Sequence, residues 1–308
     1  MSRRMARLER RDKRMSFMRV ALLLGLAVLV LGMLYRLGTG AVSALSRLHR
    51  NVEVARFGTL EDKLTGPAIV INKENVVPAT ADGHFDNMVK EQEKISKGIL
   101  LGYLVTSQSQ VPLRAQESGT FMRQIDGLED VMQNIDLQSV TPEVFKYKPT
   151  PVKADQAAVA GQPLYKIVDS LEPNQLLLHF PLKDVDFEVE PQQQVKIRWG
   201  GRELENAVIT DMKQDFGELL LMIRFKGFQE ELLAQRFIEV EAVFNSYSGY
   251  MIPEKALVGS GGEKGIYCSN GEDISFKPVK ILKTKDDICI VEGLQQNEMY
   301  VTNPPQSK

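Results

Sequence analysis

The sequence "ATADGHF" at residues 79–85 returns in altered form as "AQESGTF" at residues 115–121, and both follow the pattern Ala-x-x-x-Gly-x-Phe. A second phrase is also repeated, because Gly98 opens "GILLGYLV" and Gly161 opens "GQPLYKIV". Two matching phrases in the same order indicate an internal duplication. We therefore expect two similar halves that fold together.

The two copies differ in length. Gly83 of the first copy corresponds to Gly119 of the second, and the two phrases start 19 residues apart in the first copy and 46 residues apart in the second. The second copy therefore carries an insertion at about residues 127–155. Asp126 and Gly127 predict a turn into this insertion, and its three prolines predict short helices and extended chain rather than a long pair of helices.

The N-terminal part of the chain is strongly basic and then strongly apolar. Residues 1–19 carry eight basic and two acidic side chains, and residues 20–35 carry no charge. We predict a basic cytoplasmic head at residues 1–16 and a transmembrane helix at residues 17–37, since about 20 helical residues cross a hydrocarbon core of about 30 Å. The alternative is a signal peptide cleaved after Ala44, where small residues form a plausible cleavage site.

The remainder of the chain is predicted to lie outside the membrane, because the basic excess precedes the span. Its short segments alternate apolar and polar residues between glycines, prolines and asparagines, which indicates β-strands. One hairpin is clear, since "QVKIRW" at residues 194–199 and "RELENAVIT" at residues 202–210 flank two glycines. The fold class is therefore mainly β, and a net charge of −2 argues against a nucleic-acid partner.

The duplicated segment resembles the two halves of a lipoyl-like domain, which is also called a barrel-sandwich hybrid. The order of segments along the whole chain resembles the HlyD-type membrane fusion proteins, the periplasmic adaptor subunits of efflux and secretion systems. The phrases that carry this resemblance are "ATADGHF", "EQEKISKGILLGYLV", "AGQPLYKIVD", "YMIPEKALV" and "VEGLQQNEMYVTNP".

The resemblance implies a division of the exported chain into a linker and three β domains. The expected parts are a linker with N-terminal strands joining the β domains at 38–75, a lipoyl-like domain at 76–169 with the insertion at 127–155 in its second half, a β-barrel domain at 170–249, and a small C-terminal β domain of the membrane-proximal type at 250–304.

The segment between the two halves departs from the family pattern in two ways. Only "TSQSQ", residues 106–110, separates them, which is too short for the long helical hairpin that reaches an outer-membrane channel. The chain therefore resembles the shortened versions of single-membrane bacteria. The same segment has no lysine, so we expect no lipoyl or biotinyl group and no other cofactor.

The residues that could support catalysis or metal binding are sparse. The histidines at positions 49, 84 and 179 have no second ligand at metal spacing, and no serine or cysteine lies in a nucleophile motif. Asp82 and Glu117 occupy matching positions of the two copies, and we interpret them as polar residues beside turns. The sequence therefore predicts no catalytic, metal-binding or cofactor-binding residue and no enzyme activity.

The two cysteines, Cys268 and Cys289, fall on strands of the last domain. A disulfide between them is feasible outside the cytoplasm, and two buried thiols are the alternative.

The function predicted from these features is that of a non-enzymatic adaptor, anchored in the cell membrane by one helix with its N-terminus inside. The resemblance implies a transporter permease or another envelope protein as partner, and self-association as a homo-oligomer. The contacts are expected on the β-barrel, the C-terminal domain or the insertion. The alternative function is a cell-envelope or cell-division scaffold without a transporter.

Overall fold

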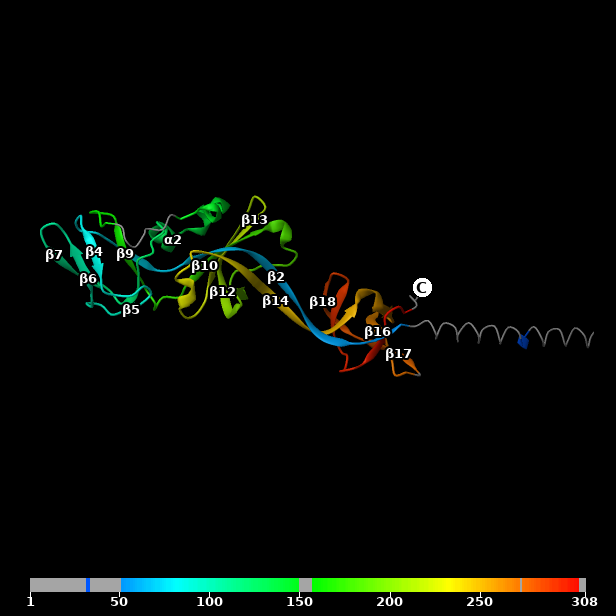
Figure 1. Cartoon of the computed structure of the whole chain (residues 1–308). Coiled ribbons are helices and arrows are strands. Elements are labelled where there is room, and N and C mark those ends of the chain that lie inside the picture. The colour runs from blue at the N-terminus through cyan, green and yellow to red at the C-terminus, as the bar shows by residue number, and fades with distance from the viewer. Residues whose placement is uncertain (1–31, 34–50, 150–156, 272, 305–308) are drawn as a thin grey trace, which may run out of the picture. The chain divides into compact units, whose positions relative to one another are not determined.

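The computed structural model describes residues 32–33, 51–149, 157–271 and 273–304 (Figure 1). Of the transmembrane helix predicted at residues 17–37, only Gly32 and Met33 belong to these ranges, and both are helical. Within the described ranges, no helix has the length and apolar character needed to cross a membrane.

The described chain is divided into two compact units, one of residues 61–246 and one of residues 1–60 with 247–308. Two long strands, β2 (Arg56–Ile71) and β14 (Phe237–Pro253), run from one unit into the other. β14 runs without interruption through residues 249 and 250, the last residue expected in the barrel and the first expected in the C-terminal domain. The prediction of a mainly β protein with a lipoyl-like domain and a β-barrel is confirmed.

The lipoyl-like domain of the larger unit consists of two small sheets. One sheet has the strand order β3 (Glu74–Pro78), β9 (Pro163–Val168), β8 (Gly119–Met122), β5 (Lys94–Ile95), and the other has the order β4 (His84–Asn87), β6 (Leu100–Val105), β7 (Gln110–Arg114). The core between them contains Phe85 and Phe121, the aromatic residues of the two repeated phrases, and both rings pack on Tyr165.

The two copies of the repeat are joined by matching backbone hydrogen bonds. Gly98, which opens the second phrase of the first copy, donates its N–H to the carbonyl of Ala115 at 2.8 Å. Gly161, which opens the second phrase of the second copy, donates its N–H to the carbonyl of Ala79 at 2.8 Å. Both glycines have a positive φ, of 87° and 82°, which glycine adopts without the steric cost that a Cβ would bring. Each copy therefore completes the other, as a pseudo-twofold arrangement requires.

The other pair of repeated glycines lies at matching close approaches of two strands. A Cβ on Gly83 would lie 2.3 Å from the carbonyl oxygen of Val105, and a Cβ on Gly119 would lie 2.4 Å from that of Val168. Because Val105 and Val168 are themselves equivalent in the repeat, the duplication extends to individual backbone contacts.

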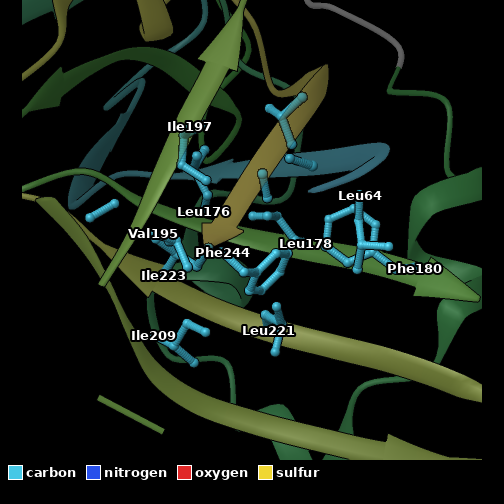
Figure 2. Close-up of a cluster of buried hydrophobic side chains, with 14 of the residues drawn as sticks. Leu64, Leu176, Leu178, Phe180, Val195, Ile197, Ile209, Leu221, Ile223 and Phe244 are labelled. Atoms are coloured by element: carbon cyan, nitrogen blue, oxygen red, sulfur yellow. The ribbon is translucent and has the colours of Figure 1, made fainter. Parts of the chain in front are cut away.

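The barrel of the larger unit is formed by six strands. They follow the order β11 (Gln194–Trp199), β12 (Arg202–Asp215), β13 (Glu218–Arg224), β10 (Gln175–Pro181), β2, β14. β11 also pairs with β14, with Ile197 opposite Ala242, so the sheet closes on itself. Its interior is apolar, and Figure 2 shows side chains such as Leu178, Ile197 and Phe244 converging there.

The insertion covers one outer face of this barrel with short helices: α2 (Glu129–Gln133) and two 3₁₀ turns, Leu137–Ser139 and Pro142–Lys146. Met132 and Leu137 pack there on outward-facing Ile69 and Leu177. The Nζ atom of Lys213 bonds to two carbonyl oxygens of the insertion, at 2.8 and 2.9 Å. The barrel strands are therefore buried on both faces where the insertion lies.

The smaller unit contains the remaining strands and the C-terminal part of β14, from residue 247 onward. One sheet has the order β1 (Val52–Val54), β20 (Met299–Val301), β16 (Glu263–Ser269), β15 (Val258–Ser260), with β17 (Ile274–Pro278) on β16. β14 pairs with β19 (Ile288–Glu292), which pairs in turn with β18 (Lys280–Lys285). Cys268 and Cys289 are free, buried thiols of one core cluster. Burial, with the charge of Glu298, raises the pKa of the Cys268 thiol to about 11.

Candidate functional site

The residues singled out from the sequence lie in different places. The four repeat glycines hold the lipoyl-like domain together, as described above. Asp82 accepts a hydrogen bond from the N–H of Ala160 at 2.9 Å, which is a turn contact. The His179 ring bonds to Glu218 at 2.7 Å and packs on Phe145 of the insertion. Among the described residues, no cluster of His, Cys, Asp and Glu could hold a metal ion.

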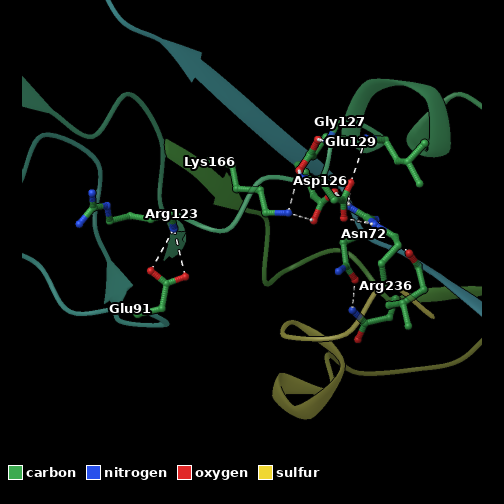
Figure 3. Close-up of polar contacts among 12 residues, drawn as sticks. Asn72, Glu91, Arg123, Asp126, Gly127, Glu129, Lys166 and Arg236 are labelled. Atoms are coloured by element: carbon green, nitrogen blue, oxygen red, sulfur yellow. Dashed lines mark hydrogen bonds and ion pairs between the residues drawn. The ribbon is translucent and has the colours of Figure 1, made fainter. Parts of the chain in front are cut away.

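The structure instead reveals a buried group of charges that sequence reasoning did not find. Lys166 lies on β9 with its side chain only 4% exposed, and its Nζ is 3.0 Å from a carboxylate oxygen of Glu74 and 3.0 Å from one of Glu129. Glu129 also accepts the N–H groups of Asp126 and Gly127, each at 2.9 Å (Figure 3). These two N–H bonds fix the turn through which the insertion leaves the lipoyl-like domain.

Arg236 continues this group of charges into the barrel. Its Nε donates to Asp126 at 2.7 Å, one terminal nitrogen donates to the carbonyl of Val70 at 3.0 Å, and the other contacts Glu74. Burial alone would lower the pKa of the Arg236 guanidinium, but the carboxylates of Glu74 and Asp126 outweigh it and raise that pKa. The arginine is therefore held charged although its side chain is only 6% exposed.

These five side chains, which we call the joint, connect three parts of the larger unit. Glu74 and Lys166 come from the lipoyl-like domain, Asp126 and Glu129 from the start of the insertion, and Arg236 from the barrel. Two cations face three carboxylates, and backbone N–H groups bond to the remaining oxygens. Removing one partner of such a buried pair typically costs about 3–5 kcal/mol, because the other charge is left uncompensated.

A cavity of about 400 Å³ opens beside the joint, with Asn72, Gln124, Pro149 and Phe237 also in its wall. Every charged side chain that lines it is already engaged in an ion pair of the joint. The arrangement is therefore suited to holding backbone segments in place.

A second group of charges lies on the barrel surface. Arg198 bonds to Glu61 through both terminal nitrogens at 2.8 Å, and also to Glu203 at 2.6 Å and Glu241 at 2.9 Å. These hydrogen bonds raise the pKa of Arg198 and lower that of Glu61. The side chains are partly exposed, so solvent screens them more than those of the joint.

The sequence contained one signal for the joint. Lys166 interrupts the apolar run "PLYKIV" of β9, in which each of the last four residues is buried. A lysine at such a position requires an acidic partner, but nothing in the sequence shows that the partners are 92 residues upstream and 37 upstream.

Comparison with known proteins gives one domain match. Residues 74–169 match the model of the RND-related barrel-sandwich hybrid domain. No curated protein matches.

Solved structures with a similar arrangement include three at low sequence identity. ZneB from Cupriavidus metallidurans is 11% identical, with a TM-score of 0.35 over 83% of this chain and 93% of that chain. MacA from Actinobacillus actinomycetemcomitans is 11% identical, with a TM-score of 0.40 over 82% and 99%. A membrane fusion protein from Streptococcus pneumoniae is 11% identical, with a TM-score of 0.33 over 59% and 100%.

Proposed function

We propose that the chain is a membrane-anchored, non-enzymatic adaptor subunit of an efflux or secretion transporter. The proposal proceeds from the barrel-sandwich hybrid domain, which the repeated phrases indicated and which supports the resemblance to the membrane fusion proteins. In this proposal one helix at residues 17–37 anchors the chain, with the N-terminus inside and the β domains outside. The adaptor assembles with a transporter permease, and with further copies of itself, through those β domains.

The observation that carries the proposal is the domain match together with the way the domain ends. The two halves are joined by a tight turn in which the N–H of Thr106 donates to the carbonyl of Ser109 at 2.8 Å. Thr106 Oγ1 accepts the N–H groups of Gln108 and Ser109 at 3.2 and 3.0 Å. No helical hairpin extends the domain at this turn, so a partner has to meet the β domains directly.

The joint supports an adaptor rather than an enzyme. Its buried charges connect the lipoyl-like domain, the insertion and the barrel, so a force applied to one part is passed to the others. We propose that the larger unit works as one stiff body in the assembly.

Purification of the full chain from its native membrane tests the proposal. A tag after Lys308 allows recovery in mild detergent, and quantitative mass spectrometry measures the stoichiometry of the proteins that accompany it. We expect a transporter permease or pump in a fixed ratio to the chain, and reduced export in a deletion strain that the intact chain restores. Recovery of cell-division or wall-synthesis proteins in its place, with export unchanged, would establish the scaffold function and refute this one.

A further inference from the structure

β1 is an edge strand with one side unpaired among the described residues. It pairs with β20 on its other side only, with Glu53 opposite Tyr300. Ala55 donates its N–H to the carbonyl of Glu298, so the odd-numbered residues of this segment bond to β20. In an antiparallel pair, the peptide groups of the residues between them point to the opposite side. The N–H and C=O groups of Val52 and Val54 therefore face an open edge.

A cleft of about 530 Å³ adjoins this strand within the smaller unit. Val54, Met251, Ile252, Pro253 and Ile288 supply its apolar wall, and they come from β1 and from the ends of β14 and β19. An open strand edge beside an apolar cleft is the combination with which proteins bind extended peptides as an added strand.

Two charged side chains, Glu53 and Arg56, line the cleft, and they differ in their contacts. The hydroxyl of Tyr300 donates to Glu53 at 3.3 Å, and burial, with that carboxylate, raises the pKa of Tyr300 to about 12. The guanidinium of Arg56, also in the wall, acts on the Tyr300 hydroxyl through its charge but makes no side-chain hydrogen bond or ion pair with a described residue. The cleft therefore offers a guanidinium that is not ion-paired to a carboxylate of the described residues.

A second copy of the chain is a poor occupant in the register centred on Glu53. If two β1 strands paired antiparallel about Glu53, the two Glu53 carboxylates would lie directly opposite each other. Like charges at directly opposed positions destabilise a strand pair. The occupant that fits the open edge, the apolar wall and the free guanidinium is a different segment, extended, apolar and bearing a carboxylate.

The distance to the predicted anchor indicates where such a segment comes from. Residues 38–51 connect the predicted span to β1, and 14 residues reach about 50 Å at most when fully extended. We propose that the cleft binds an extended apolar segment of an integral membrane partner, which adds to the edge of β1 and places a carboxylate on Arg56. The source of the segment rests on the adaptor function proposed above, whereas the peptide chemistry does not.

A peptide-binding experiment on the full chain in detergent micelles tests the proposal. The probe is a fluorescent hexapeptide of alternating valine and threonine that ends in a free carboxylate, and a second probe ends in an amide. Fluorescence anisotropy, corrected for micelles without protein, should show binding of the first probe and about tenfold weaker binding of the second, which lacks one charge-assisted hydrogen bond. Binding of neither probe would overturn the proposal.

Two variants separate the contacts. Arg56→Gln should abolish the preference for the carboxylate probe, whereas Arg224→Gln, at an exposed arginine of β13, should leave it unchanged. Val54→Pro removes an outward N–H and should weaken both probes at least tenfold while the pairing with β20 is retained. Equal binding of the two probes, or an unaffected Val54→Pro protein, would contradict the proposed mode. If the wild type binds the probe but no transporter is recovered with it, the adaptor function is refuted and the peptide-binding cleft is supported. If a transporter is recovered but the probe does not bind, only the peptide-binding cleft is refuted.

Discussion

Lys166 is a charged side chain in an apolar strand, buried between Glu74 and Glu129. We predict that Lys166→Met destabilises the protein by about 3–5 kcal/mol, because two buried carboxylates lose their shared cation. Thermal unfolding followed by circular dichroism measures the effect. The matched control is Lys94→Met, which removes an exposed lysine paired with Glu230 and should cost under about 1 kcal/mol. Equal losses in the two variants would show that the joint contributes no more than a surface pair.

Gly83 and Gly119 allow no side chain, since a Cβ would lie 2.3 and 2.4 Å from carbonyl oxygens. We predict that Gly119→Ala and Gly83→Ala each destabilise the protein by about 1–3 kcal/mol, through forced shifts of the facing strand. Gly259→Ala is the control, because a Cβ there meets no atom within 4 Å and its φ is not positive. That variant should be neutral or slightly stabilising, and a comparable loss in all three proteins would refute the packing explanation.

Arg198 makes part of the stability dependent on pH. Its hydrogen bonds hold the pKa of Glu61 and of Glu203 below the usual 4.5. A carboxyl whose pKa is lowered by folding stabilises the fold above its unfolded pKa, and the contribution is lost as the pH falls through the folded pKa. Arg198→Gln should therefore be less stable than the wild type at about pH 7, with the difference shrinking below about pH 4. Chemical unfolding at both pH values measures this. A difference that is constant with pH would exclude the carboxylates as its source.

The insertion shows what a sequence reveals about an element and what it conceals. Its three prolines correctly predicted short helices rather than a long pair. The barrel strands carried a further signal, because "AIVI" at residues 68–71 and "LLLM" at residues 219–222 are continuous apolar runs. Such runs are typical of strands buried on both faces. That the insertion covers the second face depends on the joint, whose partners are distant in sequence.

Met132 tests whether the insertion is held by this covering contact. It is buried against the outer face of the barrel, whereas Val131 in the same helix is 59% exposed. We predict that Met132→Asp releases the insertion, because a carboxylate cannot be buried among Ile69 and Leu177 without a partner. Limited proteolysis should then cleave near residues 129–146 at least tenfold faster than in Val131→Asp. Equal cleavage of the two variants would show that the apolar contact does not retain the insertion.

At the scale of the whole molecule, the repeated phrases predicted a domain of two interlocked halves, because each glycine in them has a backbone requirement that a sequence displays. The two long strands β2 and β14 were not predicted as continuous, since each contributes to two cores and its pattern changes along its length.

The orientation across the membrane is a separate prediction. Alkaline phosphatase fused after Lys308 should be active and green fluorescent protein should not fluoresce there, because the basic residues precede the span. The opposite result would place the β domains in the cytoplasm.

The pairing of β1 with β20 has a consequence for biosynthesis. Translation delivers β1 first among the described strands and β20 last, and they lie 245 residues apart by the register of Val54 with Met299. The smaller unit therefore cannot complete this sheet until β20 has left the ribosome. The lipoyl-like domain likewise cannot be completed before Gly161 is synthesised, since Gly161 of the second copy bonds to Ala79 of the first. Contacts so distant in sequence fold slowly, and the unfinished chain exposes apolar strand edges meanwhile. A nascent chain of this protein is thus a natural client for chaperones, and a premature stop before residue 299 would leave a product for proteases.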